Sequence, residues 1–249
     1  MKKYTLRTRF KDDIVCEFVV PNKVSNKVAI VCTGMPGYPR ADEMLSWLAR
    51  RGYWAFLPRY RGTWESGGKF LDKSPHQDVL DIIEELPKGF KNLWNGEIFK
   101  VKNPEVYLFG GSFGGPAVIL NSKNSKIKKV VAISPVVDWR SESKAEPLNW
   151  IEEFTKEAFG NGYRFDKKDW QKLSSGKFYN PATAIKEIDP KKVLIFHAKD
   201  DKIVEFKPVK EFSEKINCQF VALNKGEHMS IRSVMKPEFW RKIKKFFDK

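Results

Sequence analysis

A serine lies within a run of glycines at positions 110–115, which reads Gly-Gly-Ser-Phe-Gly-Gly. The run follows a short apolar segment, residues 106–109, and precedes a second one, residues 117–120. A sharp turn from strand to helix would strain the serine backbone and would leave no room for side chains two positions before and after it. This spacing makes Ser112 the candidate nucleophile. The alternative is a glycine-rich turn that only links a strand to a helix.

A general base must activate this serine, because a hydroxyl group is a weak nucleophile at neutral pH. The chain has three histidines, His76, His197 and His228. Only His228 lies in a loop after the last predicted strand, so it is the expected base. His76 is expected as an exposed residue at a helix start, and His197 is expected to pack or to orient a loop at a strand end.

A carboxylate must in turn fix the histidine tautomer and stabilise the imidazolium that forms during attack. Two adjacent aspartates, Asp200 and Asp201, follow the predicted strand at residues 193–196. The spacing of Asp201 to the apolar pair at residues 203–204 favours it as the acid. Asp200 is then expected to be a solvated or turn-forming neighbour.

Two backbone N–H groups would have to stabilise the negative oxygen of the transition state. One would come from Phe113, the residue after the nucleophile. The other would come from the loop Thr-Gly-Met-Pro-Gly at residues 33–37, where Met35 is the candidate because Pro36 has no N–H. The alternative for this loop is an ordinary turn rich in glycine and proline.

The elements that must position these residues follow from the hydrophobic pattern. The first two predicted strands are joined by only three residues, which implies an antiparallel hairpin. The later strands are short apolar runs, typical of a parallel sheet covered by helices on both faces. The eight predicted strands are residues 4–10, 14–20, 28–32, 53–57, 106–109, 129–133, 193–196 and 219–223.

Three helices can be placed by the residues at their ends. Ser74 is a candidate N-cap for a helix over residues 75–86, which has proline at its first position. A second helix is expected over residues 41–51, where Gly52 would end it. A third is expected over residues 237–247, with an aromatic stripe that belongs to the core.

No repeat, linker or low-complexity segment divides the 249 residues, so a single domain over 1–249 is expected. Residues 87–104 form a long connection before a strand and should lie away from the catalytic residues. Residues 140–180 follow the carboxyl end of a strand, where ligand sites of such sheets lie. We expect this segment to be a small helical lid or cap insertion.

With these residues in place, the chain resembles the catalytic domain of the prolyl oligopeptidase family, within the α/β-hydrolase superfamily. The matches extend from about residue 28 to about residue 235. The resemblance implies an α/β-hydrolase fold, a mainly parallel eight-stranded sheet with helices on both faces. The segments that carry it are Gly-Gly-Ser-Phe-Gly-Gly at 110–115, Arg-Tyr-Arg-Gly at 59–62, Ser-Pro-Val-Val-Asp-Trp at 134–139, Asn-Pro at 180–181, and the loops of Asp201 and His228.

The chain departs from the family pattern in three places. The loop that usually begins His-Gly begins Thr-Gly at residues 33–34, and the His-Gly that often precedes the acid is His-Ala at residues 197–198. Only a hairpin precedes the core, so the β-propeller that filters peptides in larger members is not expected. Peptide specificity is therefore not carried over, and small single-domain relatives are often carboxylesterases.

The sequence therefore predicts a serine hydrolase that works through an acyl-enzyme on Ser112, most simply a carboxylesterase for small acyl esters. No metal or organic cofactor is expected. A serine peptidase or aminoacyl hydrolase is the alternative, and it would need a carboxylate for a free amino group, from Glu65 or from residues 140–180. A non-catalytic binding protein of the same fold is a further alternative, but Ser112, Asp201 and His228 in the expected order argue against it.

The charge of the chain admits two interpretations. Lys and Arg number 46 against 31 acidic residues, which gives a net charge of +15. The lysines are mostly interleaved with acids and no nucleic-acid fold signature accompanies them, so a solvated basic surface is favoured over nucleic-acid binding. A homo-oligomer is left open.

The remaining composition indicates a cytoplasmic protein. The three cysteines, Cys16, Cys32 and Cys218, give neither a disulfide framework nor a metal-ligand spacing. The two lysines at residues 2–3 are not followed by the apolar stretch of a signal peptide. No run of about eighteen apolar residues occurs, so no membrane-spanning helix is expected.

Overall fold

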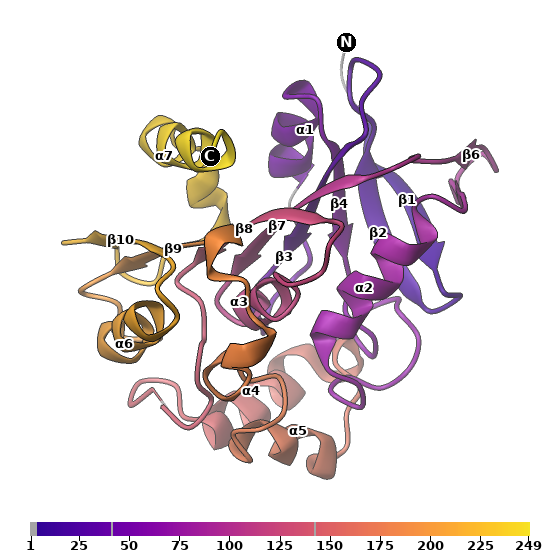
Figure 1. The fold of residues 1–249 in the computed structure, drawn as a ribbon. Coiled ribbons are helices and arrows are strands. Elements are labelled where there is room, and N and C mark those ends of the chain that lie inside the picture. Colours follow the sequence, from indigo (N-terminus) through magenta and orange to yellow (C-terminus); the bar gives the residue numbers. More distant parts are fainter. Residues whose placement is uncertain (1–3, 41, 142) are drawn as a thin grey trace.

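The computed structural model describes residues 4–40, 42–141 and 143–249. Within these residues, eight strands form one sheet in the order β1-β2-β4-β3-β7-β8-β9-β10 (Figure 1). The strands of this sheet are β1 (Leu6–Phe10), β2 (Ile14–Val19), β3 (Lys27–Cys32), β4 (Trp54–Pro58), β7 (Glu105–Gly111), β8 (Ile127–Ile133), β9 (Val193–Ala198) and β10 (Gln219–Leu223).

Strand direction follows the predicted pattern. β2 runs antiparallel to both β1 and β4, and every other pairing in this sheet is parallel. All eight predicted strands are present, with ends that differ by at most two residues. This is the arrangement of an α/β-hydrolase fold, so the predicted fold class is confirmed. The carboxyl ends of β7, β8 and β9 lie at one edge of the sheet, where Ser112 and Asp201 follow directly.

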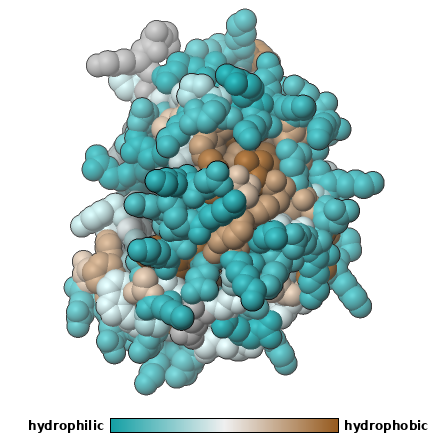
Figure 2. Space-filling view, turned by 90° about the vertical axis from the view of Figure 1, so that its left-hand side faces the viewer, coloured by the Kyte–Doolittle hydropathy of each residue, from teal (hydrophilic) through white to brown (hydrophobic). Residues whose placement is uncertain are grey.

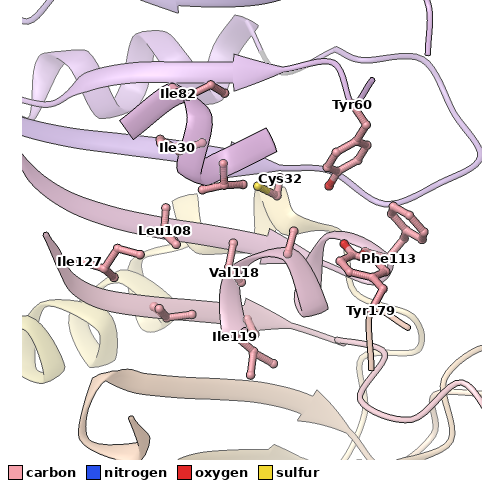
Figure 3. Close-up of a cluster of buried hydrophobic side chains, with 14 of the residues drawn as sticks. Ile30, Cys32, Tyr60, Ile82, Leu108, Phe113, Val118, Ile119, Ile127 and Tyr179 are labelled. Atoms are coloured by element: carbon pink, nitrogen blue, oxygen red, sulfur yellow. The ribbon is translucent and has the colours of Figure 1, made fainter. Parts of the chain in front are cut away.

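Helices cover both faces of the sheet. α1 and α7 pack on one face, and α2, α3 and α6 pack on the other (Figure 1). Figure 3 shows part of the second layer, where Ile82 and Val118 approach Ile30 and Leu108 from the helices. The helices of the described residues are α1 (Asp42–Arg50), α2 (Pro75–Glu85), α3 (Gly114–Ile119), α4 (Leu148–Phe159), α5 (Lys167–Ser174), α6 (Phe206–Ile216) and α7 (Pro237–Phe247), with 3-10 turns η1 (Gly160–Gly162), η2 (Pro181–Thr183), η3 (Ile185–Glu187), η4 (Pro190–Lys192) and η5 (Ile231–Met235).

The helix ends confirm Ser74 as the N-cap residue of α2 and correct the predicted exposure of His76. Ser74 stands at the N-cap position of α2, but its side chain makes no capping bond. Its hydroxyl instead meets His76 Nδ1 at 2.7 Å, and His76 is half-buried rather than exposed. The predicted first residue of the α1 helix, Ala41, lies outside the described residues, whereas Gly52 follows the helix with φ +89°, as its predicted end requires.

The long connection at residues 87–104 contains a small hairpin that the sequence pattern does not predict. Its strands, β5 (Phe90–Lys91) and β6 (Ile98–Phe99), have only two residues each. The rings of Phe90 and Phe99 lie 6.2 and 5.9 Å from the ring of Trp54, the first residue of β4. The connection therefore packs at the amino end of the sheet, away from Ser112, as expected.

The insertion at residues 140–180 contains α4 and α5, and two side-chain contacts tie its ends together. Asn180 donates to the Asp138 carboxylate at 3.0 Å, and the Trp139 indole N–H donates to the carbonyl of Tyr179 at 2.7 Å. The Asp-Trp and Asn-Pro segments on which the family resemblance depends therefore form a clasp at the base of the insertion.

The last strand, β10, is an edge of the sheet, because it pairs only with β9. Most of its residues are partly exposed. Figure 2 looks onto this side of the molecule and shows an apolar patch ringed by hydrophilic side chains. Among the helices of the described residues, none combines the length and the apolar character that crossing a membrane would demand.

Candidate active site

Ser112 occupies a strained turn between β7 and α3. Its φ is +50°, a region that L-residues other than Asn and Asp seldom adopt. A Cβ on Gly110 would lie 2.3 Å from the carbonyl oxygen of Gly114, and one on Gly114 would lie 2.1 Å from the carbonyl oxygen of Cys32. Both positions therefore exclude any side chain, which is the steric requirement that the glycine spacing predicts.

Asp201 and His228 form a hydrogen-bonded pair. His228 Nδ1 lies 2.9 Å from Asp201 Oδ2 and 3.2 Å from Oδ1. The backbone N–H groups of Ile203 and Val204 also donate to Asp201 Oδ1, at 2.9 and 3.0 Å. Burial by itself raises the pKa of Asp201, but the bonds from His228 and Val204 and the charge on His228 outweigh it and hold that pKa below its ordinary value. The carboxylate therefore stays ionised beside the imidazole.

Asp200 has a different task. Its Oδ1 accepts the backbone N–H groups of Gly226 and Glu227, each at 2.9 Å, and so fixes the loop that carries His228. The same loop is held from below by Ser134, whose hydroxyl accepts the N–H of Met229 at 3.2 Å. Asp200 was expected to be solvated or to form a turn. In the structure it instead joins the loop after β9 to the loop that carries His228.

His197 orients the loop of the acid, as predicted. Its ring is fully buried, and Nε2 lies 2.8 Å from the carbonyl oxygen of Val204 and 3.5 Å from Asp201 Oδ2. Burial lowers the pKa of His197, so the neutral ring donates its Nε2 proton to Val204. Its Nδ1 has no hydrogen-bond partner in the described structure.

The loop at residues 33–37 lies against the nucleophile. A Cβ on Gly34 would be 3.1 Å from Ser112 Cβ and 3.7 Å from its Oγ. Met35 and Phe113 line the same cavity as Ser112. Among the described residues, neither backbone N–H donates a hydrogen bond to another protein group. Both N–H groups are thus free to bind a negative oxygen, which fits the predicted oxyanion hole.

Two tyrosines that sequence reasoning missed hold this loop in place. The Tyr60 hydroxyl donates to the carbonyl of Thr33 at 3.0 Å, and the Tyr163 hydroxyl accepts the N–H of Gly37 at 3.1 Å. These two bonds order the loop, which begins Thr-Gly in this chain. Tyr60 belongs to the Arg-Tyr-Arg-Gly segment, which the family resemblance had already singled out. Nothing in the sequence around Tyr163 indicates its contact with Gly37.

A cavity of about 670 Å³, counted up to its open mouth, adjoins Ser112. Its walls come from the segment after β8, from the start of α4 and from the loop after β9. Most of the lining is apolar, namely Met35, Phe113, Val136, Val137, Trp139, Leu148, Ile151, Ile203, Val204, Pro208 and Val209. The insertion thus contributes directly to the cavity.

The structure brings His228 to Asp201 but does not bond it to the serine. Among the hydrogen bonds of the described residues, none joins Ser112 Oγ to the His228 ring, and His228 lines a neighbouring recess with Met229 and Ser230. Its side chain is 24% exposed, so the ring has room to turn. Bonds of this kind are often long or absent before substrate binds and tighten in the complex.

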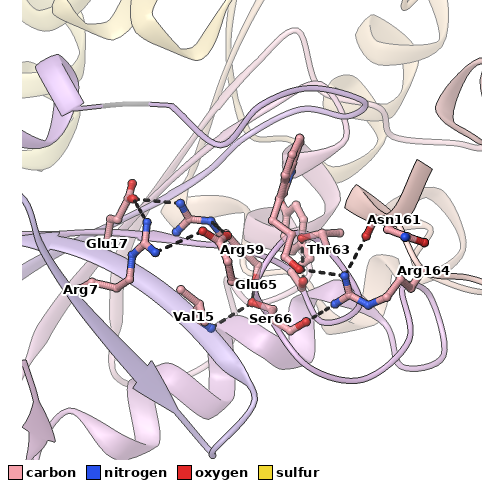
Figure 4. Close-up of polar contacts among 11 residues, drawn as sticks. Arg7, Val15, Glu17, Arg59, Thr63, Glu65, Ser66, Asn161 and Arg164 are labelled. Atoms are coloured by element: carbon pink, nitrogen blue, oxygen red, sulfur yellow. Dashed lines mark hydrogen bonds and ion pairs between the residues drawn. The ribbon is translucent and has the colours of Figure 1, made fainter. Parts of the chain in front are cut away.

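Glu65 does not lie at the cavity, which contradicts its predicted role as an anchor for a substrate amine. Its carboxylate pairs with Arg59 at 2.8 Å and with Arg7 at 3.2 Å, in a network that Glu17 completes (Figure 4). The carboxylates that do line the cavity away from the clasp are Glu146 and Glu205. The prediction for Glu65 is wrong because Arg7 and Arg59 already pair with its carboxylate.

The insertion is fastened to the loop at residues 62–72 by backbone-directed contacts. The Arg164 guanidinium donates to the carbonyl oxygens of Trp64 and Ser66 in this loop and of Asn161 within the insertion, and its backbone N–H donates to the carbonyl oxygen of Gly62 (Figure 4). This side of the insertion is therefore a fixed wall. Across the described parts of the chain, no three His, Cys, Asp or Glu side chains gather as a metal ion would require.

Solved structures of other proteins share this fold. An esterase from Pyrococcus furiosus superposes with a TM-score of 0.69 at 18% identity, covering 99% of this chain and 91% of that one. An acylaminoacyl peptidase from Pyrococcus horikoshii gives a TM-score of 0.62 at 18% identity, covering 99% of this chain but only 40% of that one. These identities establish a shared fold alone. No curated protein matches the chain.

Sequence comparison identifies the family. The model of the prolyl oligopeptidase family matches residues 39–249, which is most of the chain and includes Ser112, Asp201 and His228. The resemblance expected from the segments around Ser112 and Trp139 is therefore confirmed, and it makes the protein a serine hydrolase of the α/β-hydrolase superfamily. The chain belongs to the prolyl oligopeptidase family.

Proposed function

We propose that the protein is a carboxylesterase that cleaves small acyl esters through a covalent intermediate on Ser112. The observation that carries this proposal is the apolar cavity of about 670 Å³ that adjoins Ser112, Met35 and Phe113. An acyl chain would bury its methylene groups there, at about 0.8 kcal/mol for each. The finite size of the cavity favours short and medium chains.

The proposed reaction proceeds in two halves. His228 takes the Ser112 proton as the oxygen attacks the ester carbonyl, and the resulting imidazolium is stabilised by Asp201. The N–H groups of Phe113 and Met35 stabilise the negative oxygen, each by about 3 to 4 kcal/mol in comparable sites. His228 then protonates the alcohol, the alcohol departs, and the acyl group remains bound to Ser112. In the second half His228 activates a water molecule, which releases the acid and restores Ser112.

Labelling with a fluorophosphonate probe tests the nucleophile. We expect wild-type protein to be labelled and Ser112→Ala to be unlabelled. Ser141→Ala is a matched control, because Ser141 lines the same cavity but lies outside the turn. A folded wild-type protein that takes no label would refute the proposal and would favour a non-catalytic role.

A series of p-nitrophenyl esters tests the substrate class. We expect kcat/KM to be greatest for acetate to hexanoate esters and to fall for palmitate. A steady rise of kcat/KM up to palmitate would contradict a preference for small acyl groups.

Hydrolysis of aminoacyl substrates is a second candidate, favoured by Glu146 and Glu205. Both carboxylates line the cavity, and neither forms an ion pair with the described residues although the chain carries an excess of cations. They could receive the free amino group of a peptide or amino acid ester. In that case Glu146→Gln and Glu205→Gln would raise KM for aminoacyl anilides at least tenfold and would leave acetate ester hydrolysis unchanged.

A further inference from the structure

A recess distinct from the candidate active site opens between α7 and the amino-terminal part of the sheet. It is lined by Lys27 at the start of β3, Tyr53 just before β4, and Tyr107 near the start of β7. It has a volume of about 820 Å³ up to its open mouth. Ser112, Asp201 and His228 all follow the carboxyl ends of strands, so neither the nucleophile nor its partners contribute to this recess.

Aromatic rings form its walls. Tyr53 and Tyr107 pack edge to face with centroids 5.4 Å apart, and the Phe247 ring lies 4.7 Å from Tyr107 and 6.2 Å from Trp240. Because each ring packs against another, the walls are rigid surfaces on which a planar ligand can stack.

The tyrosines also offer unused hydrogen-bond donors. Burial raises the pKa of Tyr53, so its hydroxyl keeps its proton. Among the hydrogen bonds of the described residues, none involves the Tyr53 or the Tyr107 hydroxyl, although Tyr53 is only 6% exposed. Two phenol groups thus stand in the recess without a protein acceptor.

Three cations line the recess without a carboxylate partner. Lys27, Arg51 and Lys244 form no ion pair with any described carboxylate, and Asp248 is the only acid among the lining residues. The Arg51 guanidinium is fixed 3.6 Å over the ring of Trp47. Burial and the neighbouring Arg50 lower the pKa of Arg51, which agrees with a locally positive potential. An anion would therefore be attracted here.

We propose that this recess binds a small molecule in which a planar aromatic ring is joined to a phosphate, such as a nucleoside monophosphate. The ring would stack on the aromatic walls, and the phosphate would accept hydrogen bonds from Lys27 and Lys244. Three cations line the recess against Asp248, and Glu105 beside Lys27 adds a second negative charge nearby, so a net positive charge remains to attract a phosphate group. The enclosed part of the recess, about 380 Å³, accommodates one nucleotide. This site goes beyond the hydrolase reaction and does not depend on it.

Isothermal titration calorimetry on the full chain tests the proposal with adenosine 5′-monophosphate, adenosine and inorganic phosphate. We expect the nucleotide to bind at least tenfold more tightly than adenosine or phosphate alone. Lys244→Glu should weaken nucleotide binding at least tenfold. Lys242→Glu is the matched control, because it makes the same charge change on the same helix but Lys242 does not line the recess. Circular dichroism spectra and thermal unfolding of both variants should match wild type, which shows that they are folded.

Two results would overturn the proposal. Equal weakening by Lys244→Glu and Lys242→Glu would mean that the basic surface attracts anions without a defined site. No heat from the nucleotide up to about 5 mM would exclude the site, since even a millimolar complex would be mostly formed at that concentration. If Lys244→Glu disturbed folding, the Tyr107→Phe variant, which removes one hydroxyl from the recess and keeps the packing, would replace it and should likewise weaken nucleotide binding.

Discussion

Asp200 and Asp201, which follow β9, have different functions. Asp201 faces the imidazole of His228 and is stabilised there by two backbone N–H groups, whereas Asp200 turns to the backbone of Gly226 and Glu227. The first contact sets the tautomer and charge of the proposed base, and the second sets the position of its loop. Substitution of each residue should therefore have a different consequence.

We expect Asp201→Asn to lower kcat for ester hydrolysis by about 10³ to 10⁴, because an amide favours the wrong histidine tautomer and cannot stabilise the imidazolium. Asp200→Asn keeps an oxygen that can accept the loop N–H groups, so its kcat should fall no more than about tenfold. Steady-state kinetics on the two variants, with circular dichroism to verify folding, checks the comparison. A greater loss in Asp200→Asn would show that the acid is misassigned.

His197 should make stability depend on pH. Burial holds its pKa in the folded protein below the ordinary histidine value of 6.5, so the unfolded chain binds a proton more readily than the folded one. The contribution of the neutral ring is therefore complete above pH 6.5 and is lost as the pH falls below it. In His197→Gln the decrease in unfolding free energy between pH 7.5 and about 5.5 should be smaller than in wild type. Urea denaturation at the two pH values measures this, and an equal decrease would contradict it.

The sequence predicted the candidate triad because the glycine spacing and the strand order constrain where Ser112, Asp201 and His228 lie. The sequence could not predict the residues that hold the loop at residues 33–37, which contains Met35. Tyr163 reaches Gly37 across 126 positions, and such a contact depends on how the insertion folds back. The prediction for Glu65 failed for a different reason, because Arg7 of β1 and Arg59 after β4 pair with its carboxylate.

At the scale of elements, the turn between β7 and α3 tolerates no added methyl group. Gly114→Ala would place a Cβ 2.1 Å from a backbone oxygen that cannot move without shifting β3. We expect a loss of more than about 3 kcal/mol of stability, as for severe overpacking, together with loss of ester hydrolysis. Gly37→Ala is the control, because its Cβ would meet nothing within 4 Å. Thermal unfolding of both variants decides this, and a stable, active Gly114→Ala protein would refute it.

The insertion should loosen when its guanidinium anchor is removed. Arg164→Ala deletes the donors to three carbonyl oxygens, each bond to a charged donor being worth about 1.5 to 3 kcal/mol. We expect proteolytic cleavage within residues 140–180 at least tenfold faster than in wild type. Lys168→Ala, an exposed residue of the same insertion, should leave the rate unchanged. Equal cleavage of the two variants would mean that Arg164 does not fix the insertion.

The hydrophobic pattern predicted the large elements well because buried strands and amphipathic helices each leave a period in the sequence. The β5–β6 hairpin escaped prediction because strands of two residues have no period to detect. The N-cap position of Ser74 was predicted, but its hydroxyl makes no capping bond because it has a competing partner in His76. The Asp-Trp and Asn-Pro segments were noticed by resemblance, but their joint function as a clasp requires the folded insertion.

For the molecule as a whole, positive charge is unevenly compensated. Arg61 contacts three carboxylates, those of Asp13, Asp78 and Asp81, at 2.6 to 2.7 Å. By contrast, no cation of α7 forms an ion pair with any carboxylate in the described parts of the chain. Most of the exposed ion pairs elsewhere contribute little to stability. The net charge of +15 should therefore act mainly by repulsion, which destabilises the compact state.

This balance predicts that salt stabilises the protein. Raising NaCl from about 10 mM to about 100 mM shortens the screening length from about 30 Å to about 10 Å and weakens repulsion across the molecule. We expect Tm to rise by about 2 to 4 °C, equivalent to about 1 kcal/mol for a chain of this length. The double variant Lys242→Glu/Lys245→Glu lowers the net charge by four, since each change removes a positive charge and adds a negative one. It should melt higher than wild type at low salt and respond less to added NaCl. A fall of wild-type Tm with salt would mean that attractive ion pairs, such as those of Arg61, outweigh the repulsion.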